Sequence, residues 1–235
     1  MSVLNYKHLE WDSEFFNYKV AEIRLNTTTE PLLLETISEL KKQNYSLIYL
    51  FLDNKVNFEN KLFSIKLVDE KKTYLKNIDE QNIYFNDIIL YNFDFANSEL
   101  IELAIESGIY SRFNLDEKIE NSKFENLYEQ WIVNSVNKKI AKEILICEQE
   151  NAIAGMITLG VKNERGDIGI IAVNKNFRGK NIASKLISSA ELYFKNIGYS
   201  EIQVVTQGVN IPACNLYEKN GFSVYKTEFV YHIWL

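Results

Sequence analysis

Apolar and polar residues change their period several times along the first third of the chain, which predicts alternating strands and helices. Residues 18–25 alternate apolar and polar side chains, as a strand does. Residues 30–43 repeat with helical spacing and carry Pro31 in the first turn, where proline is favoured. The elements predicted for this first lobe, residues 1–85, are an aromatic-rich turn at 9–17, strands at 18–25, 46–53 and 71–78, and helices at 30–43 and 57–66.

The rest of the chain, residues 86–235, continues the alternation as a second lobe. Residues 97–108 predict a helix, with Asn97 or Ser98 as its N-cap and Gly108 as its end. The remaining predicted elements are strands at 86–94, 143–149, 152–162, 166–174 and 201–207, helices at 122–139, from about Arg178 to Asn196 and from about Pro212 to Lys219, and closing strands within 222–235. This order indicates an α/β fold of two closely joined lobes.

Composition narrows the class of protein. Hydrophobic residues make up 46% and charged residues 25% of the 235 residues, which is the balance of a globular protein. The net charge of −6 argues against a general nucleic-acid binder, and no apolar run approaches the roughly 20 residues that span a membrane. The start lacks the pattern of a signal peptide, and the two cysteines form no CxxC pair of the kind that binds zinc. We therefore expect a cytoplasmic protein without a bound metal.

A basic turn joins a predicted buried strand to a predicted helix. Arg178 and Lys180 flank Gly179 where this helix begins. A helix N-terminus offers free N–H groups and the positive end of the macrodipole, and glycine lets a ligand approach the backbone closely. The turn therefore favours a phosphate or diphosphate ligand. The alternative is a solvated basic turn that binds nothing.

Two motifs in this half of the chain favour a bound phosphate or diphosphate over a solvated turn. The run Arg178-Gly179-Lys180-Asn181-Ile182-Ala183 resembles the coenzyme A signature Q/R-x-x-G-x-G/A of the GNAT superfamily of N-acetyltransferases. The set Asn210, Ala213, Tyr217, Gly221 and Phe222 resembles the second signature of that superfamily. The resemblance covers residues 86–235. It implies the GNAT fold, in which a mixed, mostly antiparallel central sheet splays between its fourth and fifth strands and is flanked by helices.

One position departs from the GNAT signature. Asn181 stands where the signature has its first glycine. Asparagine is the non-glycine residue that best tolerates a positive φ, so we expect the loop to keep its shape.

The resemblance implies acyl transfer from acetyl-coenzyme A, or another acyl-coenzyme A, to an amine by direct attack. The diphosphate is expected on the backbone amides from Arg178 to Ser184. The pantetheine arm is expected along Ile171, Ala172 and Val173, where backbone N–H groups can stabilise an oxyanion. This places the cofactor between the fourth and fifth strands of the sheet.

Catalytic roles follow from the same resemblance. Tyr217 is the implied general acid for the departing thiolate, and the alternative is a packed aromatic side chain. Asn210 is expected to cap a helix, to bind the cofactor, or to do both. No general base can be chosen among Asp167, Glu201 and Gln207. Cys214 and His232 are expected to be structural.

Several short segments indicate the acceptor amine. The stretches LEWDSEFFNYKV, YSRFNLD, YEQWI and VTQ resemble a GNAT branch that acylates nucleotide-linked amino sugars, typified by dTDP-fucosamine acetyltransferase. This implies transfer of an acetyl or larger hydroxyacyl group to the 3- or 4-amine of a dTDP-linked amino-dideoxyhexose. The product would serve a bacterial surface polysaccharide, such as the O-antigen of lipopolysaccharide. The relatives also imply a homodimer, which the sequence itself does not show.

The candidate substrate residues are polar or aromatic. Arg112 can clamp a diphosphate with two parallel hydrogen bonds. Trp11, Phe15, Phe16 or Trp131 can stack on a base or a sugar. Further candidates are Asp12, which can accept a hydrogen bond from a sugar hydroxyl, and Gln207, which can orient the amine or a water.

Three alternatives stay open at this point. The WDSEFF stretch can be an aromatic-rich element of the fold without any ligand. The enzyme can act on peptide or protein amines, which predicts an acidic groove for a cationic peptide. The protein can also be a non-catalytic, coenzyme A-binding interaction protein.

Overall fold

The structure, a computed structural model, describes residues 4–26, 30–58, 63–78 and 84–235. Contacts within the chain divide it into two compact units, residues 1–71 with 227–235 and residues 72–226. In this described part of the chain, no helix is both long and apolar enough to cross a membrane.

Two long strands explain why no single boundary separates the units. Strand β4 (Ser64–Asn77) begins in the first unit and ends in the second, and strand β10 (Ser223–Trp234) does the reverse. The sequence pattern predicts one boundary after residue 85. In the structure, residues 72–85 belong to the second unit and residues 227–235 to the first.

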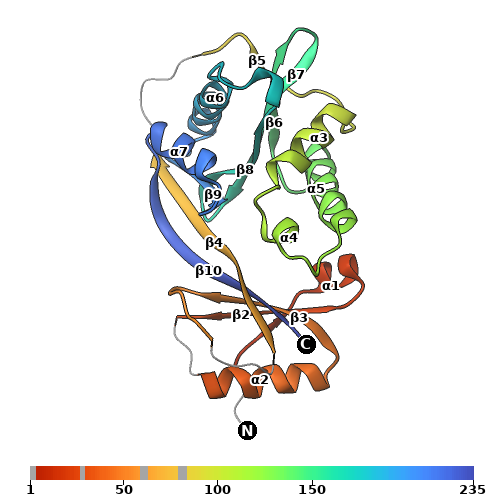
Figure 1. Ribbon diagram of the computed structural model, residues 1–235. Helices are drawn as coiled ribbons and strands as arrows, with labels where there is room; N and C mark the ends of the chain where they lie inside the picture. Colours follow the sequence, from red (N-terminus) through yellow and green to blue (C-terminus); the bar gives the residue numbers. More distant parts are fainter. Residues whose placement is uncertain (1–3, 27–29, 59–62, 79–83) are drawn as a thin grey trace. The chain divides into compact units, whose positions relative to one another are not determined.

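The first unit is a sheet packed against a helix (Figure 1). Its strands lie in the order β1-β2-β3-β10, with β2 parallel to β3 and β10 antiparallel to β3. Helix α2 buries Leu33, Ile37 and Leu40 in the same cluster as Ile48 and Leu50 of β3. The elements of this unit are β1 (Lys7–His8), α1 (Glu10–Phe16), β2 (Lys19–Leu25), α2 (Glu30–Lys42) and β3 (Tyr45–Leu52), with parts of β4 and β10.

Two predictions for this part of the chain are wrong where the structure describes it. Residues 10–16 form helix α1 and not a turn, because two helical turns are too short to show a period in the sequence. The helix predicted at residues 57–66 fails at Ser64–Lys66, which begin strand β4, because sheet pairing overrides local propensity. Residues 59–62 of that prediction lie outside the described residues.

The second unit is a mixed sheet with helices on both faces. Its strands lie in the order β4-β9-β8-β7-β6-β5. Figure 1 shows α6 on one side of β6, β7 and β8, and α3 and α5 on the other. The elements are β5 (Ile88–Leu90), α3 (Ser98–Ser107), α4 (Arg112–Leu115), α5 (Asn121–Val136), β6 (Glu143–Gln149), β7 (Ala152–Lys162), β8 (Arg165–Val173), η1 (Lys175–Phe177), α6 (Ile182–Asn196), β9 (Glu201–Gln207) and α7 (Ile211–Lys219).

Successive side chains along the strands point to opposite faces of the sheet and enter two separate cores. In β6, Leu145 and Cys147 belong to the cluster that contains α6 and α7. Ile144 and Ile146 belong to the cluster that contains α3 and α5. A strand with apolar residues on both faces requires cover on both faces, and this confirms the predicted sheet flanked by helices.

One predicted helix start is confirmed, and two other predicted boundaries differ in the structure. Asn97 caps α3 as predicted, because its side-chain oxygen accepts a hydrogen bond from the N–H of Leu100 at 2.9 Å. Helix α6 begins at Ile182 and not near Arg178, because Gly179 and Asn181 both have positive φ. The predicted closing strands are a single strand, β10.

The predicted splay of the sheet is confirmed between β8 and β9. These strands pair in parallel at Gly166–Ile202, Asp167–Gln203 and Ile168–Val204, and the pairing in the described chain ends there. The last residues of β8, 171–173, continue to pair with β7 on their other side. This leaves one edge of β8 without a neighbouring strand beyond Ile168.

Candidate functional site

The loop between β8 and α6 has the geometry of an anion site. Gly179 has φ +78° and Asn181 has φ +61°, so the predicted tolerance of Asn181 for positive φ is realised. A Cβ added to Gly179 would meet no atom within 4 Å, so space is open beside the backbone. The N–H groups of the first turn of α6, Ile182 to Ser184, have no acceptor inside the helix. The loop therefore presents backbone donors to open space.

The cations of this loop have acidic neighbours that the sequence analysis missed. The Nη2 of Arg178 lies 2.7 Å from an oxygen of Glu106 on α3, and its Nε donates to the carbonyl of Val173. The Nζ of Lys180 lies 3.9 Å from an exposed carboxylate, that of Glu150. The positive charge of the loop is thus partly neutralised before any ligand binds.

A third cation anchors the first turn of α6. The Nζ of Lys185 lies 2.6 Å from Asp87 Oδ2, and the buried thiol of Cys147 lies 3.9 Å from the same oxygen. Hydrogen bonding to the Lys185 ammonium holds the pKa of the Asp87 carboxyl below its ordinary value. This pair ties α6 to the residues before β5, so Lys185 serves the fold in the structure.

The unpaired edge of β8 leads directly to this loop. Ile171 and Val173 are half-buried and pack against the α6 and α7 cluster, whereas Ala172 belongs to the opposite cluster. An extended ligand beside this edge can pair with the backbone as an added strand does. We call this loop and this edge together the cofactor slot, after the ligand that the sequence predicts there.

Tyr217 lies on α7 in the apolar cluster of the second unit. Its side chain is 3% exposed, and its ring lies 5.6 Å from that of Tyr74 and 5.9 Å from that of Phe222. Burial, with a smaller contribution from Cys214, raises the pKa of the Tyr217 phenol above its ordinary value. The phenol therefore keeps its proton at neutral pH, as a general acid must.

Tyr74 is a buried partner of Tyr217 that the sequence analysis did not find. Its hydroxyl donates to Glu218 on α7 at 2.8 Å. Tyr74 comes from β4, outside the two signatures, so only the fold brings it to α7.

The start of α7 is built as predicted. The side-chain oxygen of Asn210 accepts a hydrogen bond from the N–H of Ala213 at 3.2 Å, which makes Asn210 the N-cap. The carbonyl of Gln207 accepts from the N–H of Asn210 at 2.9 Å. Cys214 is buried with its thiol 3.7 Å from the same carbonyl, in agreement with a structural role.

The two carboxylates considered as bases have partners in the sheet. Asp167 accepts from the side-chain amide of Gln203 at 2.7 Å, and Glu201 pairs with Arg165 at 2.8 Å. The buried imidazole of His232 stacks on Tyr49 with ring centroids 4.9 Å apart. These contacts support structural roles for all three.

The substrate candidates of the second unit lie close together. The guanidinium of Arg112, in α4, lies 4.5 Å from the ring centroid of Phe113. The half-buried ring of Trp131, in α5, lies 6.0 Å from Phe113 in an edge-to-face arrangement. Arg112 and Trp131 thus pack around a shared phenylalanine.

The candidates of the first unit share helix α1. Trp11 is 42% exposed and stacks on Phe15 with an interplanar angle of 7°. Asp12 lies one residue further along this helix. Phe16 is 4% exposed and stacks on Tyr18, so its ring faces are occupied by the fold. Of the three predicted aromatic side chains in α1, Trp11 is the most exposed and Phe16 is buried.

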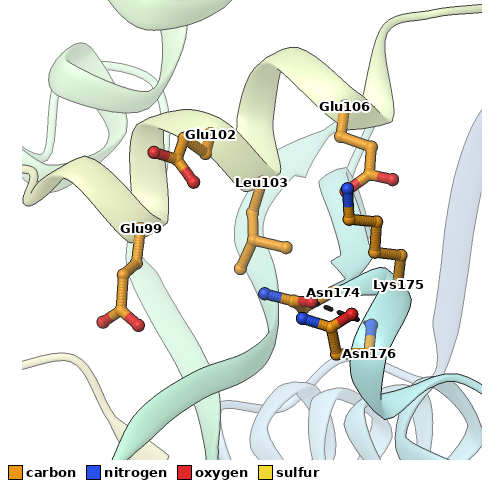
Figure 2. Close-up of a pocket in the computed structure, with 7 residues that line it drawn as sticks. All are labelled: Glu99, Glu102, Leu103, Glu106, Asn174, Lys175 and Asn176. Atoms are coloured by element: carbon orange, nitrogen blue, oxygen red, sulfur yellow. Dashed lines mark hydrogen bonds between the residues drawn. The ribbon is translucent and has the colours of Figure 1, made fainter.

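A cavity of about 300 Å³ lies between α3 and the residues that follow β8 (Figure 2). Figure 2 shows the carboxylates of Glu99, Glu102 and Glu106 spaced along one side of the helix. The other lining residues are Leu103, Asn174, Lys175 and Asn176. The cavity is acidic and adjoins the cofactor slot, because Glu106 also contacts Arg178. Among the described residues, no group of three or more His, Cys, Asp or Glu side chains is placed to hold a metal ion.

Comparison with known proteins finds a family model that matches part of this unit. Residues 109–222 match the model of the acetyltransferase (GNAT) family. A crystal structure of a GNAT-family acetyltransferase from Novosphingobium aromaticivorans has a TM-score of 0.58 at 12% identity, covering 100% of this chain and 90% of that one. At this identity the likeness shows the fold, and the fold is the GNAT fold.

Two curated relatives match parts of the chain. The spore coat polysaccharide biosynthesis protein SpsD of Bacillus subtilis is 25% identical over 135 residues, which cover 57% of this chain and 46% of that protein. The N-alpha-acetyltransferase 30 of Schizosaccharomyces pombe is 38% identical over 69 residues, which cover 29% of this chain and 46% of that protein. The chain thus matches less than half the length of either relative.

Proposed function

Because residues 109–222 match the model of the GNAT acetyltransferase family, we propose that this protein transfers an acyl group from acyl-coenzyme A to an amine. The observation that carries the proposal is the cofactor slot. Its loop presents backbone donors and an uncrowded Gly179, and its edge at residues 171–173 has no strand partner on the β9 side. A diphosphate fits the loop and an extended pantetheine arm fits the edge.

The chain's own residues supply the rest of the reaction. The amides from Arg178 to Ser184 hold the diphosphate, and Asn210 fixes the start of α7 beside the slot. The amine attacks the thioester carbon, a C–N bond forms, the C–S bond breaks and the amine's extra proton passes to solvent. Tyr217 donates its phenolic proton to the departing thiolate, and a proton from solvent restores the phenol before the next turnover. The raised pKa of Tyr217 keeps that proton available at neutral pH.

We propose a nucleotide-linked amino sugar as the acceptor, with an acetyl or a larger hydroxyacyl group transferred. The match to a spore coat polysaccharide biosynthesis protein supports an acceptor used in polysaccharide assembly. Arg112 and Trp131 are the proposed contacts for the nucleotide diphosphate and a ring. Trp11, Asp12 and Gln207 remain proposed substrate residues, and the homodimer remains a prediction.

A peptide amine is the second candidate acceptor. The acidic cavity beside α3 and the match to N-alpha-acetyltransferase 30 both favour it. We prefer the sugar acceptor as the proposal because SpsD matches a larger share of this chain than N-alpha-acetyltransferase 30 does.

A thiol-release assay with acetyl-coenzyme A tests the proposal. The acceptors are a panel of dTDP- and UDP-linked amino sugars, with a lysine peptide and a peptide with a free N-terminus as comparisons. We expect turnover with a dTDP-linked amino sugar. Turnover with a peptide and with none of the sugar nucleotides would mean that the acceptor is a peptide amine. Absence of coenzyme A binding in calorimetry would reject the acyltransferase itself.

A further inference from the structure

Strand β8 carries an irregularity where the sheet opens. Residues 155–157 of β7 pair with residues 173–171 of β8, whereas Leu159 pairs with Ile168. Thr158 of β7 therefore lies opposite two residues of β8, Gly169 and Ile170. This is a β-bulge, which bends its strand and increases the local twist.

The hydroxyl of Thr158 supplies the hydrogen bond that the bulge removes from the ladder. Thr158 is 2% exposed, and its Oγ1 accepts from the backbone N–H of Ile170 at 2.8 Å. A buried N–H without an acceptor is costly, so this side chain stabilises the bulge at this position.

Gly169 leaves room for the Thr158 hydroxyl at the bulge, because it has no Cβ. A Cβ added to Gly169 would lie 2.8 Å from Thr158 Oγ1, the sole atom within 4 Å. The φ of Gly169 is not positive, so the position needs glycine for space and not for conformation. Gly169 is also exposed, so its backbone is accessible to a ligand. Thr158 and Gly169 therefore form a matched pair.

The bulge lies at the start of the cofactor slot. The last pair between β8 and β9 is Ile168–Val204, and the bulge follows at the next residue. We propose that Thr158 is a positioning residue, whose hydroxyl holds the bulge and thereby opens the edge that receives the pantetheine arm and the thioester. This inference rests on the proposed acyl-coenzyme A function and names what shapes its site.

Calorimetry with two ligands tests the role of the hydroxyl. Coenzyme A uses both the loop and the edge, whereas ADP carries a diphosphate without a pantetheine arm and uses the loop alone. For Thr158→Val, which keeps the shape and removes the acceptor, we expect coenzyme A to bind about tenfold more weakly and ADP to bind within about twofold of wild type. Thr158→Ser, which keeps the hydroxyl, should restore coenzyme A binding.

Thr36 offers a matched control. It is buried in α2 of the first unit, and its hydroxyl also accepts a backbone N–H, that of Leu4 at 2.9 Å. Thr36→Val should lower the melting temperature and leave the affinity for both ligands unchanged. Equal loss of coenzyme A and ADP affinity in Thr158→Val, or no loss of either, would overturn the inference. Failure of wild type to bind coenzyme A would reject the proposed function as well.

A second pair of variants tests the steric match and does not depend on Thr158→Val folding. Gly169→Ala should weaken coenzyme A binding because the new methyl group collides with the Thr158 hydroxyl. Thr158→Ala alone should weaken binding as Thr158→Val does, and adding Gly169→Ala to it should weaken binding no further, because the methyl group then meets no hydroxyl. Wild-type affinity in Gly169→Ala, or losses that add in the double variant, would contradict the proposed pairing.

Discussion

The two compact units use their charged side chains differently. In the first unit, Arg24 pairs with Glu22 at 2.8 Å and with Glu228 at 2.9 Å, and Lys71 also pairs with Glu228. The side chain of Glu228 is 9% exposed, so this network lies partly inside the fold. In the second unit, the side chains of Arg178 and Lys180 stay about half exposed, 58% and 48%, beside open space.

This difference separates charges that hold a fold from charges that meet a ligand. A buried carboxylate held by two cations is costly to disturb and offers nothing to solvent. Exposed cations next to backbone donors lose little interaction free energy when a phosphate replaces their carboxylate partner. We therefore place the chemistry in the second unit, and the following changes should affect the two units unequally.

The largest effect is expected from Tyr217→Phe. Loss of the general acid should lower kcat by about 100-fold or more, with little change in the affinity for coenzyme A. Tyr231→Phe is the control, because Tyr231 is a buried tyrosine of the first unit whose hydroxyl bonds to Val56. Steady-state thiol release measures both variants. Equal kcat values in Tyr217→Phe and wild type would remove Tyr217 from the mechanism.

The pH profile sharpens the same assignment. The protonated phenol is the active form, and burial raises the pKa of Tyr217. The proton is therefore retained past pH 10, about the ordinary tyrosine pKa, and kcat should show no alkaline decrease below it. Acyl transfer followed from pH 7 to pH 10 at saturating acceptor measures this. A decrease with a lower midpoint that vanishes in Tyr217→Phe would show a phenol with an ordinary or depressed pKa.

Gly179→Ala should have the next largest effect. Its methyl group would enter the open space beside the loop at a residue with φ +78°, and we expect coenzyme A to bind about tenfold more weakly. Gly198→Ala is a matched control, since Gly198 has φ +90° and equally open surroundings after the end of α6. Both variants carry the same kind of backbone strain. Equal weakening in both would mean that strain, and not ligand approach, explains the result.

Glu106→Gln should have a smaller effect of opposite sign. It removes a negative charge that competes with a diphosphate for Arg178, so coenzyme A should bind a few-fold more tightly at low salt. High salt should reduce the gain. Glu39→Gln in the first unit, which disrupts the exposed pair with Lys42, is the control. Weaker binding in Glu106→Gln would mean that Glu106 holds Arg178 in its binding position.

Arg24→Met should change activity least. It removes one partner of Glu228 and leaves Lys71 in place, so we expect a loss of stability of about 1 kcal/mol. The values of kcat and KM should stay within about twofold of wild type, since Arg24 belongs to the network that holds the fold. Thermal melts and thiol release measure the two quantities. A large loss of activity without loss of stability would give the first unit a direct part in the chemistry.

The sequence predicts most of the second unit because local signals and the fold agree there. Asn97 and Asn210 are both N-caps in the structure, as their positions before apolar periodic segments indicate. The sequence places the start of α6 too early, because the positive φ values at Gly179 and Asn181 delay the helix and leave no mark on its periodicity.

The contacts that modify the site cannot be predicted from local sequence patterns, because they join residues far apart in the chain. Glu106 lies 72 residues before Arg178, and only the packing of α3 against β8 brings the two together. The bulge opposite Thr158 is equally hidden, because the run GDIGIIAV reads as a regular buried strand. Pairing register between strands decides both the bulge and the slot.

The most direct test of the account is a crystal structure of the full chain with coenzyme A. We predict the diphosphate on the amides between Arg178 and Ser184, and the pantetheine arm along residues 171–173 with its sulfur near Tyr217. Coenzyme A bound elsewhere, or a diphosphate that contacts no amide of this loop, would contradict the account.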